Sequence, residues 1–264
     1  VEVIDALSQG KLTTTYCYHQ GYWDGAEREF RGFGMVEQLD SEMFTADHNS
    51  SGLHGEATPF EPVAERHFSH PTWTKTWFHQ GPVGPEFGDW QEDLDRSGEF
   101  WPDDPPLFDH REFIDPFLRD LARTEPRRRR IRREALRALR GSVLRTELYA
   151  LDGERQDRPY TVTEAQYGLR EVAPPDENQP ERLRIFFPHL VAQRTTQWER
   201  GDDPMTQFVF TGDYDDYGQP QQQTQVACPR GWRSLADKPK AGYLATRSQS
   251  VYVQNTDTTV YIKD

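Results

Sequence analysis

The chain has 264 residues and carries 31 Lys and Arg against 44 Asp and Glu, which gives a formal net charge of -13. This excess of acid argues against a protein that binds nucleic acid or an anionic membrane, and no apolar run approaches the roughly 18 residues that a membrane span needs. With 7 Trp, 11 Tyr and 15 Phe, the chain is also too aromatic to be disordered.

The first 40 residues are expected to form an aromatic hairpin. Tyr16 and Tyr18 alternate on one strand, a turn follows, and Phe30 to Val36 returns as a second strand. The second strand contains Gly32 and Gly34. Glycine inside a strand indicates a bulge or the close approach of another backbone or a large ring.

The next segment predicts one more strand, from Phe68 to Phe78, followed by an acidic insertion rich in Pro and Gly between residues 81 and 106. The aromatic residues of this region are expected in the core, although such rings can also stack on sugars or a peptide. They are Trp73, Trp77, Phe78, Phe87 and Trp90.

A helix is predicted from about Pro126 to Arg140, since Pro suits the first helical position and Gly141 the end of a helix. Its apolar face consists of Ile131, Ala135, Ala138 and Leu139. Ten Arg and two Glu between residues 123 and 145 give a local charge of +8, which leaves -21 for the rest of the chain. We expect this basic segment either to face an acidic surface, in this chain or on a neighbour, or to be a solvated face.

After Gly141 the period of the apolar residues changes from 3.6 to 2, which predicts an antiparallel meander. The expected strands are 143–150, 160–172, 182–187, 194–200, 206–213 and 221–227, and a last hairpin pairs 251–253 with 260–262. The fold class is therefore mainly β with one arginine-rich helix. The chain divides into an aromatic hairpin region with the insertion (1–110), a helical segment (111–141) and the meander (142–264).

Neither a metal site nor a cofactor site is predicted. His67, His70 and His79 follow Glu65, but their spacing is not that of a zinc site. The acids at 202–203 and 213–216 lack the periodicity of a calcium loop and are expected to serve turns.

No catalytic residue can be nominated, because the chain contains no nucleophile elbow, phosphate loop or H-E-x-x-H motif. The cysteines Cys17 and Cys228 could form one disulfide, although strand cysteines so far apart in sequence are more often free and buried.

Three segments carry a common signature. Residues 16–37 follow the pattern Y-x-Y-x-x-G-Y-x-D-x-x-x-R-E-F-R-G-F-G-x-V-E, residues 75–81 follow K-T-W-F-H-x-G, and residues 214–218 follow Y-D-x-x-G. In the last of these, Tyr packs, Asp accepts hydrogen bonds from turn amides and Gly supplies a positive φ. The chain thereby resembles the middle region of the B component of Tc insecticidal toxin complexes, and RHS-repeat shell proteins. The residues that carry the resemblance are Tyr16, Tyr18, Gly21, Tyr22, Asp24, Arg28, Glu29, Phe30, Arg31, Gly32, Phe33, Gly34, Trp77, Tyr214, Asp215 and Gly218.

The resemblance implies a structural, non-catalytic function without cofactors. The chain would be a wall segment of an RHS-type β-shell, in a secreted bacterial toxin complex, that joins other segments of the same shell and an RHS-type partner protein around an enclosed toxic polypeptide. Because it starts at Val1 and ends at Asp264 in strand-like sequence, we expect a piece of a longer polypeptide. The alternative function is a binding module, in which the aromatic cluster or the arginine helix engages a glycan or an acidic protein partner.

Overall fold

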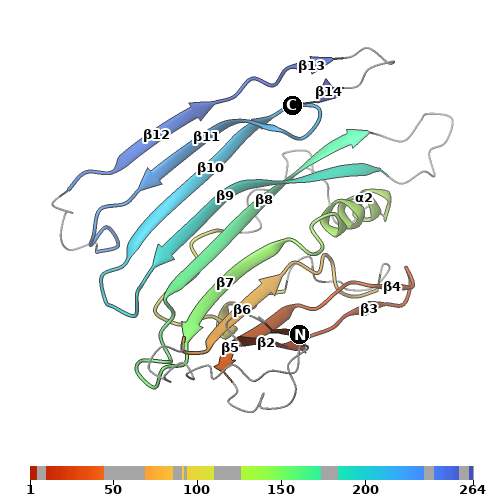
Figure 1. Cartoon of the computed structure of the whole chain (residues 1–264). Helices are drawn as coiled ribbons and strands as arrows, with labels where there is room; N and C mark the ends of the chain where they lie inside the picture. Colours follow the sequence, from red (N-terminus) through yellow and green to blue (C-terminus); the bar gives the residue numbers. More distant parts are fainter. Residues whose placement is uncertain are drawn as a thin grey trace, which may run out of the picture.

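The structure, a computed structural model, describes residues 1–4, 10–44, 69–85, 91, 94–109, 126–173, 184–234, 241–255 and 262–263. Ten strands form one antiparallel sheet in the order β1-β2-β5-β6-β7-β8-β9-β10-β11-β12 (Figure 1). The prediction of a mainly β fold with antiparallel strands and one helix is therefore confirmed.

The strands of this sheet follow each other almost in chain order. Their bounds are β1 Glu2–Ile4, β2 Gly10–His19, β5 Met35–Phe44, β6 Thr72–Phe78, β7 Val143–Ala150, β8 Thr161–Ala173, β9 Ile185–Gln197, β10 Met205–Tyr214, β11 Pro220–Ala227 and β12 Leu244–Gln249. Two small sheets pair β3 Trp23–Asp24 with β4 Glu29–Phe30 and β13 Gln254–Asn255 with β14 Ile262–Lys263. Since β6 pairs with β7, strands from before and after the helical segment belong to one sheet.

The predicted return strand of the first hairpin is wrong in its start. β5 begins at Met35, and residues 20–34 leave the sheet as a separate loop that contains β3 and β4. Gly32 has a φ of +88°, which lies in the left-handed region and is incompatible with a continuous strand. We refer to residues 20–34 as the signature loop.

In the meander, the structure differs from the prediction at three places. The segments predicted as 182–187 and 194–200 form one strand, β9, because Pro188 lies where β9 pairs with β8 but not with β10, so its missing N–H breaks no ladder. The exposed strand β12 was not predicted. Residues 251–253 are not a strand, and the described pair of the last hairpin is β13 with β14.

The predicted helix is confirmed as α2, Pro126–Arg137, which ends slightly earlier than expected. Gly141 follows with a φ of +81°. Ala135, Leu136 and Leu139 are buried in one cluster with Leu169 of β8, so the helix packs on the sheet. Among the described helices, none is long and apolar enough to span a membrane.

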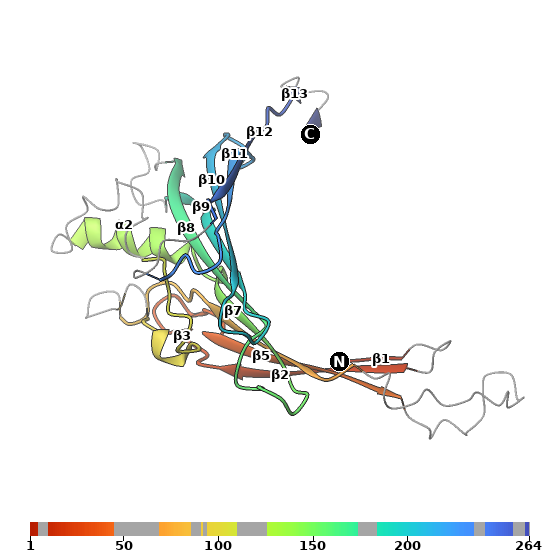
Figure 2. The same cartoon turned by 90° about the vertical axis from the view of Figure 1, so that its left-hand side faces the viewer.

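The sheet is bent, and its two sides differ. Figure 2 shows α2, β3 and the short 3-10 helix η2, Ser97–Glu99, on the outer side of the bend. The segment 94–109, which contains η2 and which we call the strap, lies on this side. The inner, concave side carries no helix among the described residues.

Candidate functional site

The strap crosses the outer face of the sheet and binds four successive strands. Trp77 of β6 donates its indole N–H to Glu99 Oε2 at 2.9 Å, and the backbone N–H of Trp101 donates to Glu147 Oε1 of β7 at 2.9 Å. On β8, Glu164 Oε1 accepts the backbone N–H groups of Leu107 and Phe108 at 3.0 and 3.1 Å. The contact with β9 is made by Asp104.

Asp104 is the centre of the strap and is completely buried. Its carboxylate accepts hydrogen bonds from Arg194 Nη1 at 2.5 Å, Trp198 Nε1 at 2.7 Å and Arg233 Nη2 at 3.2 Å. Its backbone carbonyl accepts another from Arg145 Nη2 at 2.8 Å. A buried carboxylate with this many donors remains satisfied and holds the strap to the sheet.

The strands beneath the strap present an unusual row of buried charges. In the strand registers, Trp77 lies opposite Arg145, Arg145 opposite Glu164, and Glu164 opposite Arg194. The three charged residues are at most 1% exposed. Arg194 binds Glu164 Oε2 at 2.7 Å, so each charge in the row has an opposite charge beside it. We call this side of the sheet the strap face.

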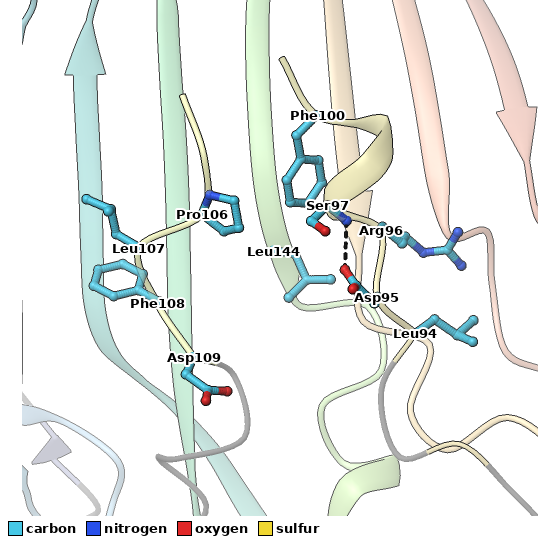
Figure 3. Close-up of a pocket in the computed structure, with 10 residues that line it drawn as sticks. All are labelled: Leu94, Asp95, Arg96, Ser97, Phe100, Pro106, Leu107, Phe108, Asp109 and Leu144. Atoms are coloured by element: carbon cyan, nitrogen blue, oxygen red, sulfur yellow. Dashed lines mark hydrogen bonds between the residues drawn. The ribbon is translucent and has the colours of Figure 1, made fainter. Parts of the chain in front are cut away.

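A β-bulge adds one apolar residue to the strap face. The register of β6 with β7 shifts between Trp77 and Phe78, so that Leu144 is the extra residue beside Arg145. Both Leu144 and Arg145 are buried. Leu144 thereby lines a cavity of about 470 Å³ between the first part of the strap, residues 94–100, and its last part, residues 106–109 (Figure 3). Phe100 and Leu107 line the same cavity.

Next to this row, Glu147 binds Arg145 Nε at 2.7 Å and accepts the hydroxyl of Tyr149 at 2.6 Å. Burial raises the pKa of Tyr149, and its hydrogen bond to the Glu147 carboxylate raises this pKa further. The hydroxyl therefore stays protonated and serves as a donor in the protein interior.

The signature loop docks on α2 through Asp24. This carboxylate is buried and accepts Arg31 Nη2 and Arg133 Nη2, both at 2.8 Å, as well as the backbone N–H groups of Ala26 and Glu27. Burial by itself would raise the pKa of Asp24. The amide hydrogen bonds and the two guanidinium groups outweigh burial and lower this pKa below its usual value.

The acidic surface that the arginine helix faces is in the same chain. Glu29 of the signature loop binds Arg137 Nη2 at 2.6 Å and also pairs with Arg140, and Glu27 pairs with Arg137 at 3.2 Å. Part of the local excess of positive charge is therefore neutralised by residues 24–29.

Two glycines of the signature loop have close neighbours, and for Gly34 this neighbour is the strap. A Cβ on Gly34 would collide with the guanidinium of Arg96 and with Gln80 Oε1, and one on Gly21 would lie 3.2 Å from the ring of Phe33. Gln80 Nε2 donates to the carbonyl of Gly32 at 3.1 Å. The close neighbour of Gly34 is thus a guanidinium rather than a backbone or a ring.

The other signature residues of this loop and of the end of β2 lie nearer the surface. Tyr22 accepts the backbone N–H of Gly84 at 3.0 Å through its hydroxyl, and Arg28 has a φ of 52° in the turn between β3 and β4. Tyr16, Tyr18 and Phe30 are between 40% and 56% exposed. Phe33 contacts the rings of Tyr18 and Phe30 with centroid distances of 4.7 and 5.1 Å.

The third signature segment forms the turn after β10. Asp215 Oδ1 accepts the backbone N–H groups of Tyr217 and Gln219 at 2.9 and 2.8 Å. Tyr214 packs on the ring of Phe187 and donates its hydroxyl to the carbonyl of Leu190. Gly218 has a φ of +80°, and a Cβ there would lie 2.8 Å from Phe187 Cζ.

The residues proposed for other sites do not converge. His79 is buried beside Tyr167, His70 is exposed, and His67 and Glu65 lie outside the described residues. Within the described ranges, no three His, Cys, Asp or Glu residues are grouped to hold a metal ion. Cys17 and Cys228 are both free, but neither is buried as expected, since Cys17 is exposed and Cys228 is half-buried.

The predicted aromatic cluster is divided. Trp77 is fully buried under the strap, and Trp73 packs on Tyr149 with a centroid distance of 5.5 Å. Phe87 and Trp90 lie outside the described residues. The described tryptophans of this cluster therefore contact the chain itself.

The face of the sheet opposite the strap has a different composition. One row of residues that face each other across the strands is Thr76, Thr146, Thr163, Thr195 and Gln207. In the registers of β6, β7 and β10 to β12, and in the stretches of β8 and β9 that pair between 161–165 and 193–197, this face carries no charged residue, although 28% of the whole chain is charged. The other positions of these stretches are Thr72, Thr74, Phe78, Val143, Leu148, Ala150, Thr161, Ala165, Gln193, Gln197, Met205, Val209, Thr211, Gln223, Gln225, Ala227, Leu244, Thr246 and Ser248. We call it the Thr/Gln face. Further along β8 the same side of the sheet carries Arg170, because the neighbouring Leu169 packs towards α2.

Two families of known proteins match this chain. The family described as insecticide toxin TcdB middle/C-terminal region matches residues 134–262, and the one described as insecticide toxin TcdB middle/N-terminal region matches residues 1–51. No curated protein sequence matches the chain.

The chain is also similar to several solved structures. The chain is similar to a crystal structure of TcdB2-TccC3-Cdc42, with 28% identity and a TM-score of 0.68 over 99% of this chain and 12% of that one. A crystal structure of TcdB2-TccC3 is 28% identical with a TM-score of 0.65, over 99% of this chain and 12% of that one. A Tc holotoxin pore of Photorhabdus luminescens is 26% identical with a TM-score of 0.58, over 97% of this chain and 11% of that one. The chain thus spans about an eighth of the length of these relatives.

Proposed function

Because the chain belongs to the insecticide toxin TcdB family, as part of its middle region, we propose that it is a wall segment of a shell that encloses a toxic polypeptide. Its role is to close the wall, and it carries out no reaction. The buried acids of the strap face, Asp104, Glu147 and Glu164, support this role, because their oxygens accept structural hydrogen bonds from neighbouring groups.

The observation that carries the proposal is that the ten-stranded sheet is open at both edges. Among the described strands, β1 pairs with β2 alone and β12 pairs with β11 alone, and all six residues of β12 are exposed. Open edges present N–H and C=O groups that pair readily with a further strand. In a closed shell, strands of neighbouring segments remove both edges.

The partners follow from the relatives. TcdB2 was solved together with TccC3, and a relative forms part of a Tc holotoxin pore. We propose that the full-length protein likewise joins other segments of its own shell and an RHS-type partner, in a toxin complex that bacteria secrete. The regions 1–110, 111–141 and 142–264 would then act as one unit of the wall.

Electron cryomicroscopy of the full-length protein with its RHS-type partner tests this function. We expect a closed, hollow particle in which β12 pairs with a strand from outside residues 1–264. Protease should degrade the free toxic polypeptide and spare the enclosed one. A compact particle without a cavity, or equal digestion of both forms, would contradict the proposal.

A further inference from the structure

The Thr/Gln face is the concave side of the sheet. In an antiparallel pair, residues directly opposite each other point to the same side, and neighbours along a strand point to opposite sides. Trp77, Arg145 and Glu164 lie under the strap, so Thr76, Thr146 and Thr163 point away from it. The strap and α2 occupy the outer side of the bend, which leaves the Thr/Gln face on the inner side (Figure 2).

Over the stretches of strand defined above, the Thr/Gln face lacks both of the features that make a surface adhesive to polypeptides. Charged groups attract segments of opposite charge, and clustered large apolar groups bind apolar side chains. Its positions there are mostly hydroxyl and amide side chains, with apolar residues between them. The same side of β8 and β9 also carries a separate group made of Arg170, Phe187 and His189, in which the guanidinium binds the backbone carbonyls of Tyr214 and Asp215. In β5 the same face carries two acids, Asp40, which accepts hydrogen bonds from Thr14 and Gln38, and Glu42, which accepts the backbone N–H of Ser69.

Some of the amides also bind each other. Gln225 Nε2 donates to Gln223 Oε1 at 3.1 Å, and Gln207 Nε2 contacts Gln225 Oε1 at 3.4 Å. These hydrogen bonds use some of the donors and acceptors of the Thr/Gln face. Its other donors and acceptors can form weak, exchangeable hydrogen bonds with water or with a peptide backbone. The peptide backbone offers such groups in every sequence.

We propose that the Thr/Gln face is the surface that touches the enclosed polypeptide, and that it contacts an unfolded chain of either net charge without holding it. This inference rests on the proposed function. It assigns the cargo-facing side of this wall segment and the kind of contact, which is uncharged and independent of sequence.

The first experiment locates the contact in the assembled, cargo-loaded complex. A photo-crosslinking amino acid replaces Gln207 or Gln225, which are exposed on the Thr/Gln face, or Gln249, which is exposed on the opposite face of β12. We expect that positions 207 and 225 form cross-links spread along the cargo, and that position 249 forms no cross-link to the cargo. Cross-links from 249 alone, or at one cargo site only, would overturn the proposal.

The second experiment tests the role of neutrality. Gln193, Gln207 and Gln225 are changed together to Lys or to Glu, with Gln→Asn at the same positions as the neutral control and Q249K as the control for added charge. The readout is the immobilised fraction of a fluorescent cargo, made in an acidic and a basic version, from anisotropy decay.

With the wild-type lining, both cargo versions should be equally mobile. The Lys variant should raise the immobilised fraction of the acidic cargo by about two- to five-fold, and the Glu variant that of the basic cargo, as expected for exposed ion pairs. The inference would be overturned if the wild-type Thr/Gln face already immobilised one cargo version, or if the Lys and Glu variants changed the mobility of both cargo versions in the same way. Protease protection of cargo in the wild-type complex is measured first, so that failure of enclosure itself is recognised separately.

Discussion

At the scale of single residues, the chain uses buried charges where most proteins use apolar side chains. Arg194 and Asp104 are both 0% exposed, and Glu164 is 1% exposed. Burying one charge without a partner costs several kcal/mol, whereas a buried pair with further hydrogen bonds is tolerated. The strap face is therefore sensitive to the loss of any single member.

Asp104→Asn removes the charge that Arg194 and Arg233 share. We expect the local opening free energy of residues 94–109 to fall by about 3 kcal/mol, because two guanidinium groups lose a buried counter-charge. Hydrogen exchange of the strap amides in the full-length protein measures this. The control is Asp103→Asn, next in sequence, whose side chain is 60% exposed and lies 3.9 Å from Arg158. Equal protection in both variants would contradict the assigned role of Asp104.

Gly218→Ala tests the turn after β10. Its φ of +80° disfavours a side chain, and the new Cβ would lie 2.8 Å from the Phe187 ring, so we expect a loss of about 2 kcal/mol in local stability. Gly25→Ala is the matched control, since a Cβ there meets nothing within 4 Å. Hydrogen exchange of residues 205–227 is the measurement. Adding Phe187→Leu should recover only the part of the loss that comes from the ring contact.

At the scale of elements, the docking of the signature loop on α2 depends on pH through Asp24. The pKa of Asp24 in the folded chain is below its usual value of 3.8, so its contribution to stability is complete above about pH 4. It is lost as the pH falls through the lowered pKa. Amides 22–31 should lose exchange protection in that range, after correction for the intrinsic pH dependence of exchange.

Asp24→Asn should weaken the same docking at neutral pH by about 3 kcal/mol, because Arg31 and Arg133 lose their common counter-charge. Protection in this variant should change little between pH 5 and 3. A variant that keeps the acid sensitivity of the wild type would show that another carboxylate is responsible.

The elements with a clear period could be predicted from the sequence, and those without one could not. The apolar spacing of Ala135 and Leu139 predicts α2, and alternation predicts β7, β8, β10 and β11. The strand β12 has apolar residues only at its start, Leu244 and Ala245, and all six of its residues are exposed, so no apolar alternation marks it. The break of the first hairpin at the signature loop depends on the approach of Arg96 to Gly34, 62 residues later in the sequence (96 minus 34).

The buried acids could not be selected from the sequence for the same reason. Asp104 is separated by 90 residues from Arg194 and by 129 from Arg233. With 44 acidic residues in the chain, no local pattern distinguishes Asp104 from exposed Asp103. Only the pairing of β7, β8 and β9 brings the partners together under the strap.

At the scale of the whole molecule, the two open edges predict association of residues 1–264 when they are produced alone. Exposed apolar residues lie at both edges, with Val3 at 58% and Leu244 at 69% exposure. Sedimentation should show dimers or larger species, and Thr246→Pro in β12 should reduce them, because proline cannot donate to a ladder. Gly242→Pro, just before the strand, serves as the control. A monomer at high concentration would contradict this prediction.

The strap also has a mechanical consequence. A sheet flexes most easily about lines parallel to its strands, where only hydrogen bonds join one strand to the next. The strap runs across β6, β7, β8 and β9 and is bonded to each of them, so it acts as a rib that raises the bending stiffness in that direction. The radius of curvature of this part of the sheet is then fixed from its outer side. In the proposed shell, a crowded interior would press on the wall without flattening it.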